Sequence, residues 1–143
     1  MPGALSDDEL AAYLALRRAS DRLTHAVTSQ LLGFGLTEVQ FTILAQLGAA
    51  ADGLPMSQLA RAITGSKSGL TYQVGKLADR GLVTRVPDSD DERSTRVLLT
   101  DDGKALLERA LPAHVSLVRE VFLDRLGSLD ATTLRRALDD IAN

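Results

Sequence analysis

Two short helical patterns joined by a tight turn, with a pair of strand patterns directly after them, constrain this chain more than any other feature. Residues 55–63 and 66–80 each have the apolar spacing of an amphipathic helix, and residues 64–66, Thr-Gly-Ser, join them. Residues 82–86 and 95–99 are rich in Val, Leu and Thr, as strands are. A short turn between two capped helices is what a helix-turn-helix requires. The hairpin that follows predicts a winged form of that motif.

Longer helical patterns flank this motif on both sides. The first covers residues 6–32, and the second begins at Thr37. A third runs from about residue 100 to 126, where we expect Pro112 to bend it because proline lacks the backbone N–H and clashes one turn back. A last helix follows Gly127. The side chains placed to cap these helices are Ser6 with Glu9, Thr37 with Gln40, Ser57, Ser66, Thr100, and either Ser128 or Asp130.

The order of elements predicts a fold that is mainly α with a small β-hairpin wing. We expect a single domain over residues 1–143, in which residues 37–100 form a winged helix-turn-helix region. Residues 1–36 and 101–143 would form an N- and C-terminal helical dimerisation region. The amphipathic end helices carry more apolar surface than the middle region can cover, which favours a dimer.

The composition excludes several kinds of chemistry. Cys is absent, so there are no disulfides, thiolate metal sites or cysteine nucleophiles. The longest apolar run, residues 10–16, is far short of the ~20 residues that a membrane helix needs. Acidic residues at positions 7–9 precede any apolar stretch, which is unlike a secretory signal. We therefore expect a cytoplasmic protein that does not contact a membrane.

The charge of the chain is unevenly distributed. The net charge is −3, which taken alone argues weakly against a nucleic-acid-binding protein. Residues 55–86, however, contain five basic side chains and a single acidic one. Such a basic segment in an acidic chain is a candidate contact surface for phosphate, although charge alone does not distinguish it from ordinary fluctuation.

Several stretches of the chain form a recognisable pattern: Leu-Ala-Arg-Ala at 59–62, Ser-Lys-Ser-Gly-Leu-Thr at 66–71, Leu-Ala-Asp-Arg-Gly-Leu-Val-Thr-Arg at 77–85, and the wing sequence at 91–100. Together these stretches resemble the MarR family of bacterial transcription regulators. The resemblance covers about residues 57–103 by motif and the whole chain by helix order. It implies a homodimeric, sequence-specific DNA-binding regulator, expected to be a repressor, whose two winged regions bind a pseudo-palindromic operator. It also implies release by a small aromatic or anionic effector.

The second helix of the motif supplies the expected DNA contacts. Leu70, Val74 and Leu77 form a narrow apolar stripe, so the other side of the helix faces outward. In a helix-turn-helix, the N-terminal part of this helix meets base edges in the major groove. The residues that we expect at DNA on this helix are Ser66, Lys67, Ser68, Thr71, Tyr72 and, further along, Lys76 at a phosphate. The alternative is an ordinary solvated helix face.

The wing supplies a second set of expected contacts. Arg93 lies at the hairpin tip, where an arginine can enter a narrow minor groove. The resemblance suggests that Asp91 holds its guanidinium in place. Arg85 and Arg96, on the two strands, suit the flanking phosphates. The alternative for Arg93 is a surface ion pair of ~0–1 kcal/mol.

A small-molecule pocket is expected near Tyr13, His25, Gln40 and His114, where polar side chains interrupt apolar stripes. The alternative is that these four residues are packing or surface residues. We expect no cofactor and no metal, since Arg93 occupies the position where a calcium loop needs Gly. No catalytic arrangement is visible, so an enzyme is not expected. The competing function is a winged-helix module that binds proteins and never touches DNA.

Overall fold

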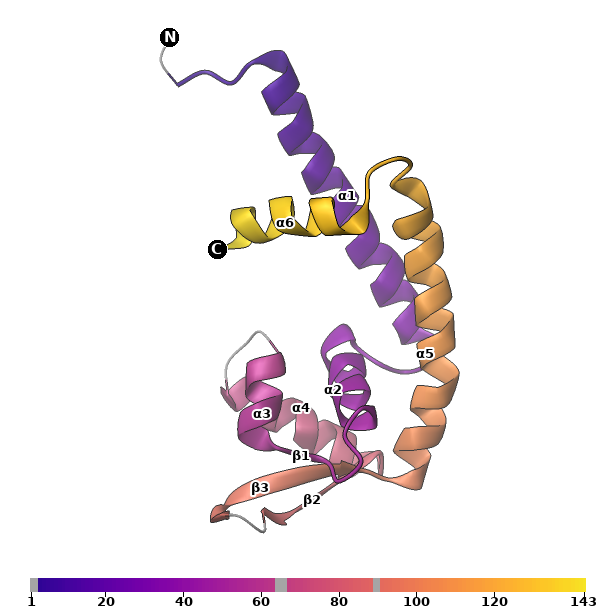
Figure 1. Ribbon diagram of the computed structural model, residues 1–143. Coiled ribbons are helices and arrows are strands. Elements are labelled where there is room, and N and C mark those ends of the chain that lie inside the picture. Colours follow the sequence, from indigo (N-terminus) through magenta and orange to yellow (C-terminus); the bar gives the residue numbers. More distant parts are fainter. Residues whose placement is uncertain (1–2, 64–66, 89–90) are drawn as a thin grey trace. The chain divides into compact units, whose positions relative to one another are not determined.

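The computed structural model describes residues 3–63, 67–88 and 91–143, with the side chains of residues 67–68 and 91–93 left out. The described chain forms two compact units (Figure 1). We call residues 30–114 the head unit, and residues 1–29 together with 115–143 the helical unit. The boundaries between the two units, at residues 29–30 and 114–115, lie inside two long helices.

The secondary structure is mostly helical and agrees with the predicted fold class. The elements in chain order are α1 (Asp7–Leu32), α2 (Glu38–Gly48), β1 (Leu54–Pro55), α3 (Met56–Ala62), α4 (Lys67–Asp79), β2 (Val83–Asp88), β3 (Asp91–Leu99), α5 (Asp101–Val121), a 3₁₀ turn (Leu123–Arg125) and α6 (Ala131–Ala142). The helix-turn-helix is α3 and α4, and the wing is the hairpin of β2 and β3.

The sheet has one strand more than the hairpin predicted from the sequence. Its order is β1-β3-β2, and both pairings are antiparallel. The two-residue strand β1 pairs Leu54 with Val97 and Pro55 with Arg96. The hairpin is also longer than expected, since Pro87 pairs with Thr95. Proline is tolerated there because β2 is an edge strand.

Most of the predicted helix caps are confirmed. Thr37 and Gln40 form a reciprocal capping box, and Ser6 and Glu9 form the same pair of hydrogen bonds. The Thr100 hydroxyl accepts from the Gly103 N–H at 3.0 Å. Asp130 caps α6 through the Thr133 N–H at 2.8 Å, and the hydrogen bonds from Thr133 lower the pKa of this carboxyl.

Two helix boundaries predicted from the sequence are wrong. Helix α3 begins at Met56 and has Pro55 at its N-cap, without a side-chain hydrogen bond, so Ser57 does not cap it. The α-helical part of α5 ends at Val121, well before residue 126, because Phe122 leaves the helical backbone conformation. Ser66, the expected cap of α4, lies outside the described residues.

The hydrophobic core lies in the head unit. Every buried residue that the structure describes falls between Leu31 and Ala110. Helices α2, α3 and α4 pack on the sheet (Figure 1). The predicted inward stripe of α4, Leu70, Val74 and Leu77, is buried as expected. The core of the head therefore fixes which side of α4 faces solvent.

The helical unit has an open apolar groove. Its volume is about 670 Å³, and it is lined by residues of α1, the end of α5, the 3₁₀ turn and α6. Helix α6 contributes Leu134 and Leu138 to the groove, yet it has no buried residue. The helical unit of a single chain therefore leaves much of its apolar surface uncovered.

Candidate nucleic-acid interface

The outer face of α4 presents polar and basic side chains opposite the buried stripe. Thr71, Tyr72 and Lys76 are all exposed, and Tyr72 retains 60% of its accessible surface. The Lys76 Nζ lies 5.3 Å from the centre of the Tyr72 ring, as a cation–π pair one helical turn apart. This face therefore combines hydrogen-bonding groups with positive charge.

A hollow of about 330 Å³ separates α4 from the hairpin. It is lined by Met56, Ser57, Thr71, Val74, Arg85, Ser94 and Thr95. Hydroxyl groups and the Arg85 guanidinium line this solvent-open space together with the apolar side chains of Met56 and Val74. The guanidinium places a positive charge there, which suits an anion.

Gly75 lies within α4, directly after Val74, which lines this hollow. A Cβ added there would meet only the Arg85 Nη1 within 4 Å, at 3.9 Å, which is an ordinary contact. Among the described residues, packing does not require glycine at this position.

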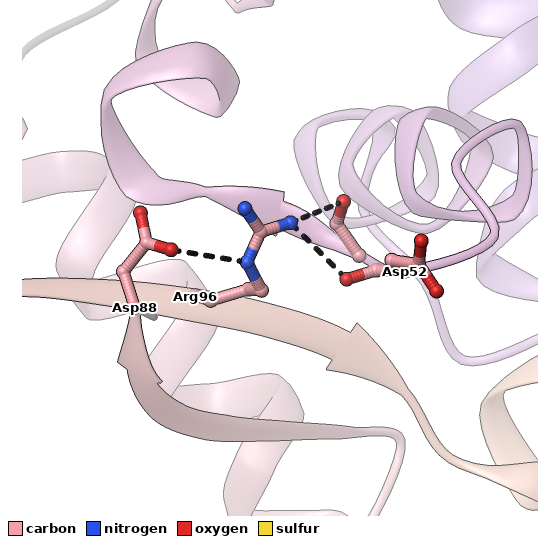
Figure 2. Close-up of polar contacts among 4 residues, drawn as sticks. Asp52, Asp88 and Arg96 are labelled. Carbon is pink, nitrogen blue, oxygen red and sulfur yellow. Dashed lines mark hydrogen bonds and ion pairs between the residues drawn. The ribbon is translucent and has the colours of Figure 1, made fainter. Parts of the chain in front are cut away.

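Arg96 is half-buried, and hydrogen bonds within the head hold its guanidinium. Its Nε donates to Asp88 Oδ1 at 3.3 Å, and its Nη1 donates to the carbonyl oxygens of Asp52 and Gly53 at 3.2 Å each (Figure 2). The side chain of Arg96 is only 23% exposed, and that of Asp88 is 7% exposed. The guanidinium of Arg96 is therefore engaged within the head through Nε and Nη1, and its expected contact with a flanking phosphate stays a prediction.

Asp88 is not among the site residues expected from the sequence. The pairing of Val86 with Arg96 places Asp88 two residues further along β2, on the same face of the hairpin as Arg96. Opposite charges placed diagonally on one face of a hairpin predict an ion pair, but only once the strand register is known.

Part of the expected interface lies outside the described structure. Ser66 is not described, and neither are the side chains of Lys67, Ser68, Asp91 and Arg93. The backbone shows that Lys67 begins α4 and that Asp91 begins β3. The predicted DNA contacts of Ser66, Lys67, Ser68 and Arg93, and the predicted pairing of Asp91 with Arg93, therefore stay predictions.

The four residues of the expected effector pocket belong to different units. Tyr13 and His25 are exposed residues of the helical unit, and the Tyr13 hydroxyl accepts from Arg17 Nη1 at 3.0 Å. Gln40 and His114 belong to the head unit. Both ends of the Gln40 amide are engaged, by the capping box and by a 3.2 Å bond to Gln73.

His114 has an unpartnered atom beside an aromatic ring. Its ring centre lies 4.7 Å from that of Phe41. Its Nδ1 is buried and has no hydrogen-bond partner among the described residues, and the same holds for Gln30 Oε1. The Gln30 Nε2 donates to the carbonyl oxygen of Ala113, the neighbour of His114, at 2.8 Å.

Comparison with known proteins identifies the family. Residues 34–94 match the model of the MarR family. The crystal structure of AbsC, a MarR family transcriptional regulator from Streptomyces coelicolor, is 35% identical, covers 97% of this chain and 95% of its own, and has a TM-score of 0.88. The chain belongs to the MarR family.

Two further transcription regulators are similar to this chain over most of their length. The HTH-type transcriptional repressor YetL of Bacillus subtilis is 34% identical, with 84% of this chain and 79% of YetL covered. Sco3205, a MarR family transcriptional regulator from S. coelicolor whose crystal structure is in complex with DNA, is 28% identical with a TM-score of 0.89. That alignment covers 99% of this chain and 90% of Sco3205.

The length and hydropathy of the helices in this MarR protein bear on membrane insertion. Within the part of the chain that the structure describes, no helix is both long enough and apolar enough to cross a membrane.

Proposed function

We propose that this protein is a homodimeric transcriptional repressor that binds a pseudo-palindromic DNA operator. The observation that carries the proposal is the exposed polar and basic face of α4, opposite the buried stripe that fixes its orientation. The second helix of a helix-turn-helix enters the major groove with this kind of face. A protein acting on the bacterial chromosome would do so in the cytoplasm.

The contacts divide by chemistry into base-reading and phosphate-binding groups. Thr71 and Tyr72, on the N-terminal half of α4, carry hydroxyl groups that suit base edges, and Thr71 also has a methyl group that suits thymine. Lys76 lies further along α4 and suits a phosphate. Arg85 lies at the hollow between α4 and the wing, where hydroxyl groups add donors for a second phosphate.

The distribution of buried residues supports the homodimer. The helical unit has an apolar groove and no buried residue among those described. A second copy of the same unit would cover this surface symmetrically. Two linked heads would then meet half-sites about one helical turn apart, ~34–36 Å.

The names of the relatives support repression as the mode of regulation and DNA as the target. YetL is named a repressor, and the structure of Sco3205 contains DNA. A dimer that covers an operator blocks transcription by occupying it.

Selection of binding sites from random duplexes tests the proposal. We expect an enriched, nearly palindromic sequence, and operator affinity that falls steeply as the salt concentration rises, because phosphate binding releases counterions. A protein–protein interaction module would enrich no sequence and would show no such salt dependence.

We also propose that a small aromatic or anionic effector regulates DNA binding. In the head unit, the buried Nδ1 of His114 beside Phe41 offers a polar group in an apolar setting, as ligand sites do. Gln40 is less available, because its amide is already engaged. Tyr13 and His25 are exposed and remain candidates from the helical unit.

Calorimetry with salicylate and related aromatic acids tests the effector. Linkage requires that a ligand which lowers operator affinity bind the operator complex more weakly than the free dimer, by the same factor. Equal affinity for both forms would contradict a regulatory role, and no binding across the panel would contradict the effector site.

A further inference from the structure

We propose that Arg96 is a positioning residue that fixes the wing on the head, and that it acts on operator binding without touching DNA. The effect on operator binding rests on the proposed DNA-binding function. The geometry of the guanidinium carries the inference, because its hydrogen bonds join three separate segments of the head (Figure 2).

Arg96 lies on the middle strand of the sheet. It is paired with Val86 of β2 on one side and with Pro55 of β1 on the other. From this central place its Nε reaches Asp88 near the end of β2, and its Nη1 reaches the loop that precedes β1. A single side chain therefore connects the outer part of the wing to the body of the head.

The bond to Asp88 is made where the hairpin is irregular. The register of β2 and β3 shifts between Pro87 and Asp88, and such irregularities bend the strands. The Asp88 carboxylate is almost completely buried, and a buried carboxylate needs a cation and hydrogen bonds. Arg96 supplies both the cation and a hydrogen bond. It does so at the irregular pairing, which sets the direction in which β2 and β3 continue toward the hairpin tip.

The bonds to the loop reinforce a very short strand. Strand β1 has two residues, and one of them is Pro55, which has no N–H to donate to β3. Gly53 has a φ of +74°, and a Cβ added to it would lie 2.2 Å from the carbonyl oxygen of Val97. The loop is thus pressed against β3 in a conformation that favours glycine, and its carbonyl groups accept from Arg96.

The expected DNA contact of the wing depends on this arrangement. Arg93 lies three residues before Arg96 on β3, within the irregular stretch between the Pro87–Thr95 and Asp88–Asp91 pairings. A shift in the direction of the hairpin would move Arg93 relative to α4. Minor-groove and major-groove contacts would then no longer be made together, and affinity would fall although no contact residue was removed.

Arginine variants distinguish a positioning role from a phosphate contact. We expect Arg96→Lys to lower operator affinity by about tenfold or more, because an ammonium group cannot make the bonds to Asp88 and to the loop together. The slope of log affinity against log salt should stay unchanged. Arg109→Lys, at an exposed arginine of α5 outside the proposed interface, is the matched control and should leave operator affinity unchanged. Arg85→Gln, at a proposed phosphate contact, should instead reduce the salt slope by about one.

Substitution of the partner gives a second test. Asp88→Asn should lower affinity although it removes negative charge near DNA, and Asp88→Asn with Arg96→Lys should cost less than the two separate losses together. Additive losses in the double variant would overturn the proposal. It would also be overturned if Arg96→Gln reduced the salt slope by about one while Asp88→Asn left operator affinity unchanged.

Hydrogen exchange provides a measurement that does not involve DNA. Amides of residues 83–99 should exchange faster in Arg96→Lys than in the wild-type dimer, while those of α2 keep their protection. Unchanged exchange in the hairpin would contradict the role of Arg96. Absence of operator binding by the wild-type protein would contradict the proposed function, and the exchange result would still decide whether Arg96 holds the wing.

Discussion

Thr71, Tyr72 and Lys76 share the exposed face of α4, but their chemistry gives them different effects on an operator. We expect Thr71→Ala or Tyr72→Ala to relax sequence preference, since each lost base contact costs about 1–3 kcal/mol at one operator position. Lys76→Ala should weaken binding to all sequences alike and reduce the salt slope by about one. Fluorescence anisotropy on operator variants and on a random duplex, at several salt concentrations, measures both effects.

The same experiment can contradict the division of roles. If Tyr72→Ala and Lys76→Ala lower specific and non-specific binding equally, the assignment of base-reading residues is wrong. Because Lys76 lies over the Tyr72 ring, a modest part of the Tyr72→Ala loss would come from a less well-placed ammonium group. That part affects all sequences and can be subtracted.

Gly75 and Gly103 are both helical glycines, yet they should respond in opposite ways to substitution. We expect Gly75→Ala to raise the free energy of unfolding by about 1 kcal/mol, because alanine favours the helix and the added Cβ meets only Arg85 Nη1 at 3.9 Å. Gly103→Ala should destabilise the protein, since its Cβ would lie 2.1 Å from the carbonyl oxygen of Leu82. Urea unfolding of both variants measures this difference, and a lower midpoint for Gly75→Ala would contradict it.

At the scale of elements, the wing is expected to act through its tip. We expect Arg93→Ala to weaken operator binding without changing the dimer, because an arginine in a narrow A·T minor groove meets strongly negative potential. Anisotropy at fixed salt measures the loss. Arg109→Ala, which removes an exposed arginine of α5, is the charge-matched control. Equal affinities of the two variants would contradict the wing contact.

The elements differ in how far the sequence could predict them. The caps at Thr37, Thr100 and Asp130 were predictable because each side chain reaches a backbone group only three residues away. Strand β1 was not, since its partner Val97 lies far along the chain and two residues show no alternation. The exposed face of α4 followed from helical periodicity, whereas the role of Arg96 depends on strand register.

At the scale of the whole molecule, the apolar groove of the helical unit should control assembly. We expect Leu138→Glu to give a monomer, because a carboxylate in the covered groove would be desolvated without a partner. Sedimentation velocity measures the change, and operator affinity should fall because the two heads no longer bind as a linked pair. Arg136→Glu, at an exposed position of the same helix, should remain dimeric. A dimeric Leu138→Glu would contradict the proposed interface.

The confinement of all described buried residues to positions 31–110 has a consequence for how such regulators diverge. Substitutions in the helical unit change little of the packing that folds the head. After gene duplication, two copies can therefore acquire mutually incompatible end helices while each retains a functional head. Paralogues in one cell would then avoid mixed dimers, and each could drift toward its own target sequence without interference from the other.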